Sequence, residues 1–170
     1  MNEYCVALDQ AKNAVKIADH MLKVTYNVVN DPKLLMVIAE RLLLAMEQVV
    51  KAIVMYEVQC HRIPPFKEEF DEMFSLFKMR CTGRYNIDSG YVDLLQEIKE
   101  VVQHHKQSPV EFSRKEEYVI CSENYETDII SKTFLNESVA KIKLFIEDVE
   151  KMLIKNQITA ASNKHEGMTL

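Results

Sequence analysis

The chain has 170 residues, of which 48% are hydrophobic and 28% charged, and its formal net charge is −5. This composition excludes a disordered chain, and the acidic balance excludes attraction of nucleic acid to the surface as a whole. No stretch is apolar for long enough to predict a membrane span, and four scattered cysteines without a Cys-x-x-Cys pair favour a reducing cytoplasm over a disulfide framework or a structural zinc.

The sequence predicts one long helix over residues 2–30. Apolar side chains recur at alternating intervals of three and four, which stacks them on one face of a helix. The residues of this face are Leu8, Ala11, Val15, Ala18, Leu22, Thr25 and Val29. Asp31 and Pro32 then suit the start of a second helix, which we expect to reach about residue 61.

This second helix is apolar around about two thirds of its circumference, which predicts a central element packed by several neighbours. Its polar side chains share the remaining third: Lys33, Glu40, Arg41, Glu47, Gln48 and Lys51. They form either a solvated face, supported by a pair between Glu47 and Lys51, or a groove that faces a ligand or a second subunit. Glu57 is the exception, because it lies outside this third.

Two shorter helices are expected next. Pro64 and Pro65 force an extended link, and a third helix should follow from about residue 66 to residue 80. Asp88 or Ser89 can cap a fourth helix, which Pro109 keeps from continuing far past Gln107.

Residues 108–133 lack a helical period, and short β-prone runs at 117–121 and 125–130 predict a small hairpin, to which residues 110–112 can add a third strand. The last helix should span residues 134–157, and the polar residues 158–170 should form a disordered tail. We therefore expect one domain, residues 1–157, that is mainly α: an antiparallel bundle of five helices with a small β-hairpin before the last helix.

The stretch HHKQSPVEFSRK, residues 104–115, gathers the most reactive side chains. His104 and His105 are candidates for acid and base catalysis, because an imidazole titrates near neutral pH. Alternatively they only complete a helix, since cations near a helix C-terminus are stabilised by its dipole. Glu111 lies between apolar neighbours, so we expect it to be held against the bundle and paired with a cation, either as a base or to fix the loop.

Four basic residues are candidates for binding phosphate or a partner's carboxylate: Lys106, Arg114, Lys115 and Arg41. For Arg114 and Lys115 the alternative is the charged tip of a hairpin. Known metal-binding and nucleotide-binding motifs are absent from the sequence, so we expect neither a metal site nor a cofactor.

Two parts of the sequence resemble HEPN domains. One is ERLLLAMEQVVKAIVMYEVQCHRIPPFKEEFDEMFSLF, and the other is YVDLLQEIKEVVQHHKQSPVEFSRKEEYVI followed by FLNESVAKIKLFIEDVEKML. The segments RIPPF, RYNID and HHKQSPVEFSRKEEYVICSENY are also similar to parts of uncharacterised archaeal proteins of this size. The resemblance covers residues 5–155.

The resemblance implies a helical bundle that dimerises and is either a metal-independent ribonuclease or the partner of a nucleotidyltransferase. The family's catalytic signature is Arg, a polar residue, three to five further residues and His. No Arg of this sequence precedes a His at that distance. The stretch from His104 to Phe112 occupies the matching place, with Glu111 after Pro109.

We therefore expect a HEPN-like homodimeric module that binds RNA or a nucleotide-handling protein partner, with weak or no ribonuclease activity. One alternative is a noncatalytic helical interaction protein. Another is a small metal-independent hydrolase that uses His104 or His105 with Glu111. The observation that separates them is whether the fold brings a histidine, Glu111 and Arg114 together in a pocket.

Overall fold

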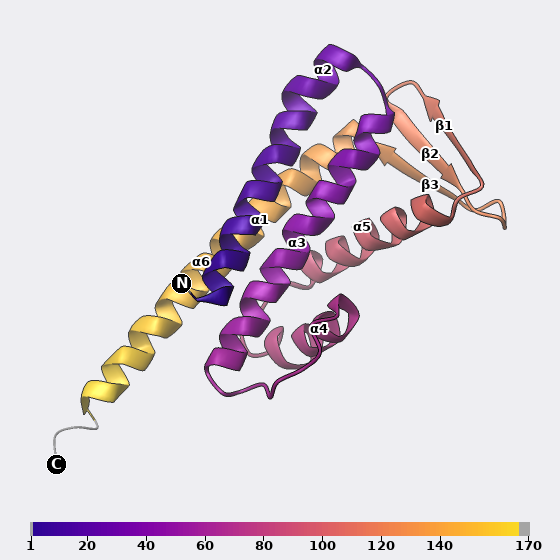
Figure 1. The fold of residues 1–170 in the computed structure, drawn as a ribbon. Helices are drawn as coiled ribbons and strands as arrows, with labels where there is room; N and C mark the ends of the chain where they lie inside the picture. The colour runs from indigo at the N-terminus through magenta and orange to yellow at the C-terminus, as the bar shows by residue number, and fades with distance from the viewer. Residues whose placement is uncertain (1, 167–170) are drawn as a thin grey trace.

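The computed structural model describes residues 2–166, which form a helical bundle with a small sheet at one end (Figure 1). The helices are α1 (Glu3–His20), continued without a break by η1 (Met21–Thr25) and α2 (Tyr26–Val29), α3 (Lys33–Gln59), α4 (Phe70–Leu76) with η2 (Phe77–Cys81), α5 (Ser89–Gln107) and α6 (Lys132–Glu166). Strands β1 (Val110–Arg114), β2 (Glu117–Cys121) and β3 (Thr127–Ser131) form an antiparallel sheet in this order. The expected fold class is confirmed, and the hairpin has its third strand.

Helix α3 is the centre of the bundle. It packs against α1, α4, α5, α6 and the sheet, because its apolar side chains cover most of its circumference. Five of its large side chains are completely buried: Leu35, Ile38, Leu42, Met46 and Ile53. None of the helices in residues 2–166 combines the length and the hydropathy needed to cross a membrane.

Helix α1 lies along α3 through a row of small residues. Ala7, Ala11, Ala14 and Ala18 follow one another at spacings of three and four, and all are buried. Small side chains let two helix backbones approach closely. The two helices are therefore neighbours over most of the length of α1 (Figure 1).

A π-helical turn shifts the buried face at the end of the first helix. We expected Thr25 and Val29 to face inward, but Tyr26 is buried, and Val29 is exposed. The π-helical turn of η1 holds one residue more than an α-helical turn. That extra residue rotates the following side chains, so the inward position moves from Thr25 to Tyr26.

The third helix begins later than expected. Residues 64–69 are not helical, and α4 starts at Phe70 after Glu69, whose backbone is extended. The expected start at residue 66 was wrong. Pro64 and Pro65 restrict the backbone before them, and four further residues, 66–69, also remain outside the helix. Phe66 nevertheless packs against the core from this link.

The last helix is longer than expected. Helix α6 continues through Glu166 and extends beyond the bundle (Figure 1), so the expected helix end at 157 and a disordered segment from 158 were wrong up to that residue. Residues 158–166 contain neither Gly nor Pro, and the hydroxyls of Thr159 and Ser162 donate to carbonyls one turn back. Residues 167–170 of the expected tail lie outside the described residues.

A buried carboxylate closes the end of α3. Glu57 is 1% exposed, and its Oε1 accepts hydrogen bonds from the hydroxyl of Tyr85 and, at 2.8 Å, from Nη1 of Arg62. Nε of Arg84 lies 3.4 Å from Oε2. Burial, followed by the bond to Glu57, raises the pKa of Tyr85, so its hydroxyl stays a donor. One carboxylate therefore ties down the two loops that flank α4 and η2.

Removing one cation from this cluster should destabilise the fold. We expect Arg62→Met to lower the free energy of unfolding by about 2 kcal/mol, because the buried carboxylate of Glu57 then loses the nearer of its two arginine partners. Urea unfolding followed by circular dichroism measures this change. Arg80→Met is the control: Arg80 is exposed on η2, so a change of about 0.5 kcal/mol or less is expected there. Equal losses in the two variants would contradict a role for the cluster.

Candidate functional site

The candidate site lies where the end of α5 meets the inner face of the sheet. The strand register aligns Glu111 with Ile120 and Ile120 with Asp128. Side chains directly opposite one another share a face of the sheet, so two carboxylates flank Ile120, which is buried in the core. Adjacent strands are about 4.8 Å apart, which separates the carboxylates by about two strand spacings.

His105 pairs with the carboxylate of β1. Its Nδ1 lies 2.6 Å from Oε1 of Glu111, and the hydroxyl of Tyr118 donates to Oε2 of Glu111 over 2.7 Å. Burial, followed by the hydrogen bond to Glu111, raises the pKa of Tyr118 to about 12, so the phenol remains a donor at neutral pH. The side chains of His105 and Glu111 are 29% and 18% exposed. The partner of Glu111 is therefore His105, which is a cation only when its imidazole is protonated.

His104 takes the other carboxylate. Its Nδ1 forms a hydrogen bond with Oδ2 of Asp128 on β3. Successive side chains of a helix point about 100° apart. The two histidines therefore reach different carboxylates, which lie on the two outer strands of the sheet. This second pair is more open to solvent than the first, with side-chain exposures of 46% and 36%.

A polar hollow of about 470 Å³ adjoins His104. Its lining residues are His104, Gln107, Ser108, Ser122, Glu123, Asn124 and Glu126. The hydroxyl of Ser108 points at two backbone carbonyls, at 2.8 and 2.7 Å, whereas that of Ser122 accepts from the backbone N–H of Glu126. With two glutamates in its lining and Asp128 behind His104, the hollow is acidic.

Arg114 does not join the histidines. Its Nη2 lies 3.3 Å from Oε2 of Glu117, and its side chain is 67% exposed. Lys115 follows in the turn between β1 and β2, with a φ of 55°. The structure thus confirms the alternative for these two residues, the charged tip of a hairpin. Glu111 folds back onto the histidines, and Arg114 does not, because three residues of an extended strand place it about 10 Å further along.

The other basic candidates lie apart from this tip. Lys106 is exposed on the last turn of α5. Arg41 lines a hollow of about 300 Å³ between α1 and α3, beside Gln10, Asn13 and Gln48. The four candidate binding residues therefore occupy three separate places and do not form one phosphate site.

The polar face of α3 is partly covered. The expected pair between Glu47 and Lys51 was wrong, because Nζ of Lys51 lies 3.2 Å from Oε2 of Glu68. Burial raises the pKa of Glu47, and the nearby charges of Lys99 and Lys106 act against this rise. The link before α4 and the side chains of α5 thus cover part of the face that a ligand groove would need.

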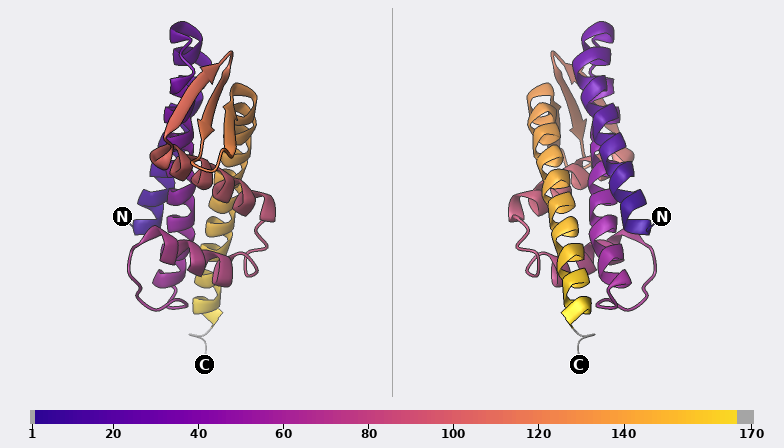
Figure 2. Two further views of the ribbon diagram at one scale, coloured as in Figure 1. Left: turned by 90° about the vertical axis from the view of Figure 1, so that its right-hand side faces the viewer. Right: turned by 90° about the vertical axis from the view of Figure 1, so that its left-hand side faces the viewer.

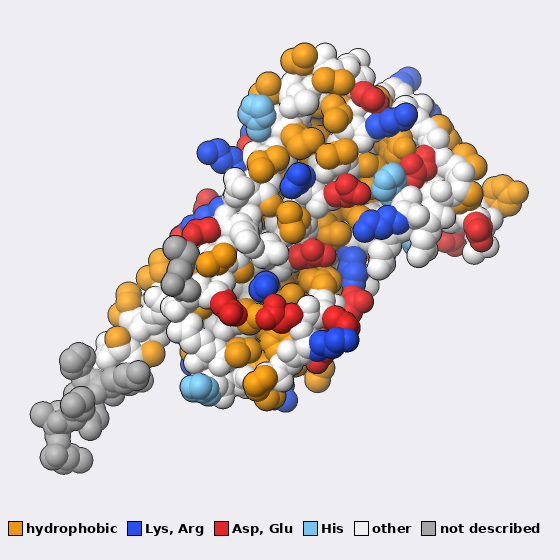
Figure 3. All heavy atoms as spheres, viewed as in Figure 1, with side chains coloured by type: hydrophobic (Ala, Val, Ile, Leu, Met, Phe, Trp, Pro, Cys, Tyr) orange, Lys and Arg blue, Asp and Glu red, His pale blue; other side chains and the backbone are white. Residues whose placement is uncertain are grey.

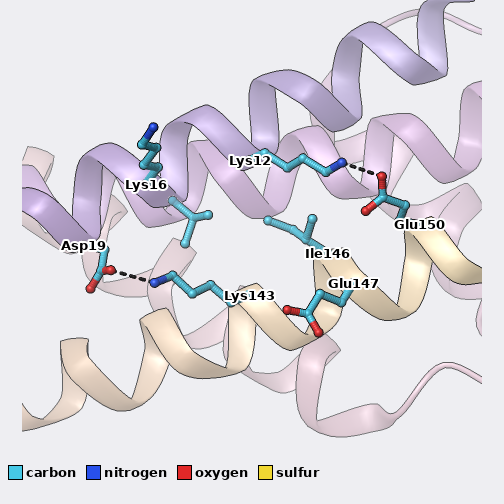
Figure 4. Close-up of a pocket in the computed structure, with 8 residues that line it drawn as sticks. Lys12, Lys16, Asp19, Lys143, Ile146, Glu147 and Glu150 are labelled. Atoms are coloured by element: carbon cyan, nitrogen blue, oxygen red, sulfur yellow. Dashed lines mark hydrogen bonds and ion pairs between the residues drawn. The ribbon is translucent and has the colours of Figure 1, made fainter.

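A groove between α1 and α6 is the other hollow of note (Figure 4). It measures about 250 Å³, and Ile146 lies between two ion pairs that join the helices. Nζ of Lys12 lies 2.5 Å from Glu150, and Nζ of Lys143 lies 2.6 Å from Asp19. Burial would raise the pKa of Asp19, but hydrogen bonds from lysines outweigh it and lower that pKa. These pairs hold α1 and α6 together, so we assign the groove no chemistry.

Metal ligands do not converge within the described part of the chain: it contains no group of three or more His, Cys, Asp or Glu side chains that could hold an ion. The histidine pairs can instead orient imidazole rings. A carboxylate on Nδ1 fixes the tautomer of a ring and leaves Nε2 to exchange a proton. This is the chemistry that the site offers.

Sequence reasoning missed Asp128 and Tyr118 as partners of the site. Asp128 has the same strand parity as the buried Ile130, which places its side chain on the inner face. That alternation is visible in the sequence, but it identifies neither the strand opposite nor the histidine within reach.

In comparisons with known proteins, no family model, no curated protein and no solved structure matches the chain.

The less exposed contacts of Glu111 should contribute more to stability than the more exposed pair of His104 and Asp128. We expect Tyr118→Phe to cost about 1–2 kcal/mol of unfolding free energy, because Glu111 then loses a donor in a partly buried place. His104→Ala should cost about 0.5 kcal/mol, because the contact between His104 and Asp128 is open to solvent. Urea unfolding of both variants measures these values.

A double-mutant cycle of Tyr118→Phe with Glu111→Ala tests whether the two side chains act together. We expect a coupling energy of about 1 kcal/mol. Additive effects would show that the hydrogen bond between Tyr118 and Glu111 does not contribute to stability.

Proposed function

We propose that the protein is a noncatalytic helical module that binds a protein partner through the outer face of its sheet. Two neighbouring rows of this face carry no charged residue. They consist of Val110, Cys121 and Thr127, and of Phe112, Val119 and Ile129. Val110, Phe112 and Ile129 are exposed, although they are apolar.

Val119 is the observation that carries this proposal. It is 5% exposed, yet it does not belong to the core cluster that holds Tyr118 and Ile120 on the other face. Phe112 and Ile129 lie on either side of it in the register. The sheet turns this face away from the helices (Figure 2, left). A contiguous apolar patch in such a place is typical of a protein-binding surface.

The distribution of charge favours a protein partner over RNA. A phosphate backbone requires a basic stripe or patch, but Arg114, Lys106 and Arg41 lie in separate places, and the hollow beside His104 is acidic. Acidic and basic side chains are also mixed over the face that α3 presents (Figure 3). The resemblance to HEPN domains supports the same proposal, since it implies protein partners such as nucleotide-handling enzymes.

Site-specific photo-cross-linking in the source cells tests the proposal. A photoreactive amino acid at Ile129 should give one discrete protein adduct, because Ile129 lies on the proposed surface and is 49% exposed. The same amino acid at Leu144, which is 54% exposed on α6, is the matched control and should give none. Adducts with RNA at residue 129, or the same adducts from both positions, would overturn the proposal.

One observation favours a second function, that of a metal-independent hydrolase. His104 has a carboxylate on Nδ1 and lines a polar hollow that also holds the hydroxyl of Ser122. In such an arrangement the imidazole takes the proton of a serine that attacks a carbonyl. This enzyme would use Asp128, and not Glu111, as the partner of its histidine.

A fluorophosphonate probe separates the two functions, because it labels serines that a neighbouring base activates. On our main proposal we expect no labelling of the native protein, measured by intact-mass spectrometry. Labelling at Ser122 that disappears in His104→Ala and persists in His105→Ala would establish the hydrolase in its place.

A further inference from the structure

Strand β1 is an uncovered edge of the sheet. It pairs with β2 on one side, and in residues 2–166 no strand pairs with its other side. Four of its five residues are exposed. In the left-hand view of Figure 2 this edge borders the sheet on the side away from α6. Such an edge presents a row of free N–H and C=O groups, which is a template for another strand.

The turn after β1 identifies which groups are free. Arg114 lies opposite Glu117, so only two residues connect the strands. A two-residue turn closes on a hydrogen-bonded pair, and the direction of the backbone groups then alternates along the strand. The groups of Arg114, Phe112 and Val110 therefore face β2, and those of Glu111 and Ser113 face outward. Beyond the ladder with β2, neither Glu111 nor Ser113 makes a backbone hydrogen bond with the described residues.

The sequence of β1 is compatible with itself in an antiparallel pair. In a two-fold pair, a residue at the centre lies opposite its own copy. A centre at Glu111 places two carboxylates opposite each other, which is unfavourable. A centre at Phe112 places the two phenyl rings side by side, Glu111 opposite Ser113, and Val110 opposite Arg114. This register contains no like-charged pair, and the aromatic pair at its centre is favourable.

We infer that β1 pairs antiparallel with β1 of a second copy of this chain, with Phe112 at the two-fold axis, to give a six-stranded sheet. The row Phe112, Val119 and Ile129 of each copy then joins that of the other, and the outer face becomes one apolar surface across both. This inference extends the proposed function, because the partner would meet a platform of twice the width.

The size of the contact predicts a weak dimer. A five-residue strand is about 17 Å long, and a single edge of that length buries less than the roughly 800 Å² per partner of a standard stable interface. The dissociation constant of the dimer should therefore lie in the micromolar range, and the dimer should form as protein concentration rises.

Sedimentation velocity of the full chain from low to several hundred micromolar tests the inference. The native protein should move from monomer to dimer over this range. Ser113→Pro should stay monomeric, because proline removes an outward N–H and leaves the ladder with β2 intact. Ser113→Ala, which keeps that N–H, is the control and should dimerise as the native protein does.

A charge pair tests the register and does not depend on proline. Phe112→Asp and Phe112→Lys should each dimerise at least about tenfold more weakly than the native chain, because like charges then face each other at the axis. An equimolar mixture of the two should dimerise better than either alone. Circular dichroism of each variant shows whether it remains folded.

Three results would overturn the inference: a native protein that is monomeric at every concentration, a folded Ser113→Pro variant that dimerises normally, or a mixture that dimerises no better than its components. None of these results would contradict the proposed function. Ile129 lies on β3, at the other edge of the sheet from β1, so its cross-link to a different protein is independent of the dimer.

Discussion

The burial of α3 is the constraint on which the rest of the structure depends. A helix of 27 residues that is apolar around most of its circumference cannot remain in water. Helices α1, α4, α5 and α6 cover it, and the inner face of the sheet covers another part. The same constraint explains the tied loops at its end, because Glu57 needs partners once neighbouring elements have removed it from water.

The sheet that covers α3 brings two carboxylates into partly buried places, and the two histidines are their hydrogen-bond partners. The inner face of the sheet brings Glu111 and Asp128 to the end of α5. Carboxylates in such partly buried places need hydrogen-bond donors. His104 and His105 supply one donor to each. The most reactive side chains of the sequence therefore act first as a brace between α5 and the sheet, and the same pairing leaves an oriented imidazole beside an acidic hollow.

The brace also determines what the outer face of the sheet can do. Because the inner face is held against the bundle, apolar side chains of alternate parity must point to solvent. Phe112 and Ile129 point this way, and they flank the buried Val119 in the strand register. An uncovered edge at β1 adds free backbone groups to this apolar face. The apolar surface, the free edge and the distribution of charge are thus the features on which the proposed association with protein rests.

The sequence by itself predicted the helices, the central place of α3, a cap for α5 at Asp88 or Ser89 and the β element before α6, because these depend on side-chain periods and caps within a few residues. It also indicated that Glu111 would be paired. Only the tertiary structure decided that His105 is its partner, that Asp128 pairs with His104 and that Arg114 lies away from both histidines. These outcomes follow from strand register and from the way α5 meets the sheet, and contacts between residues distant in the chain depend on packing that no local pattern specifies.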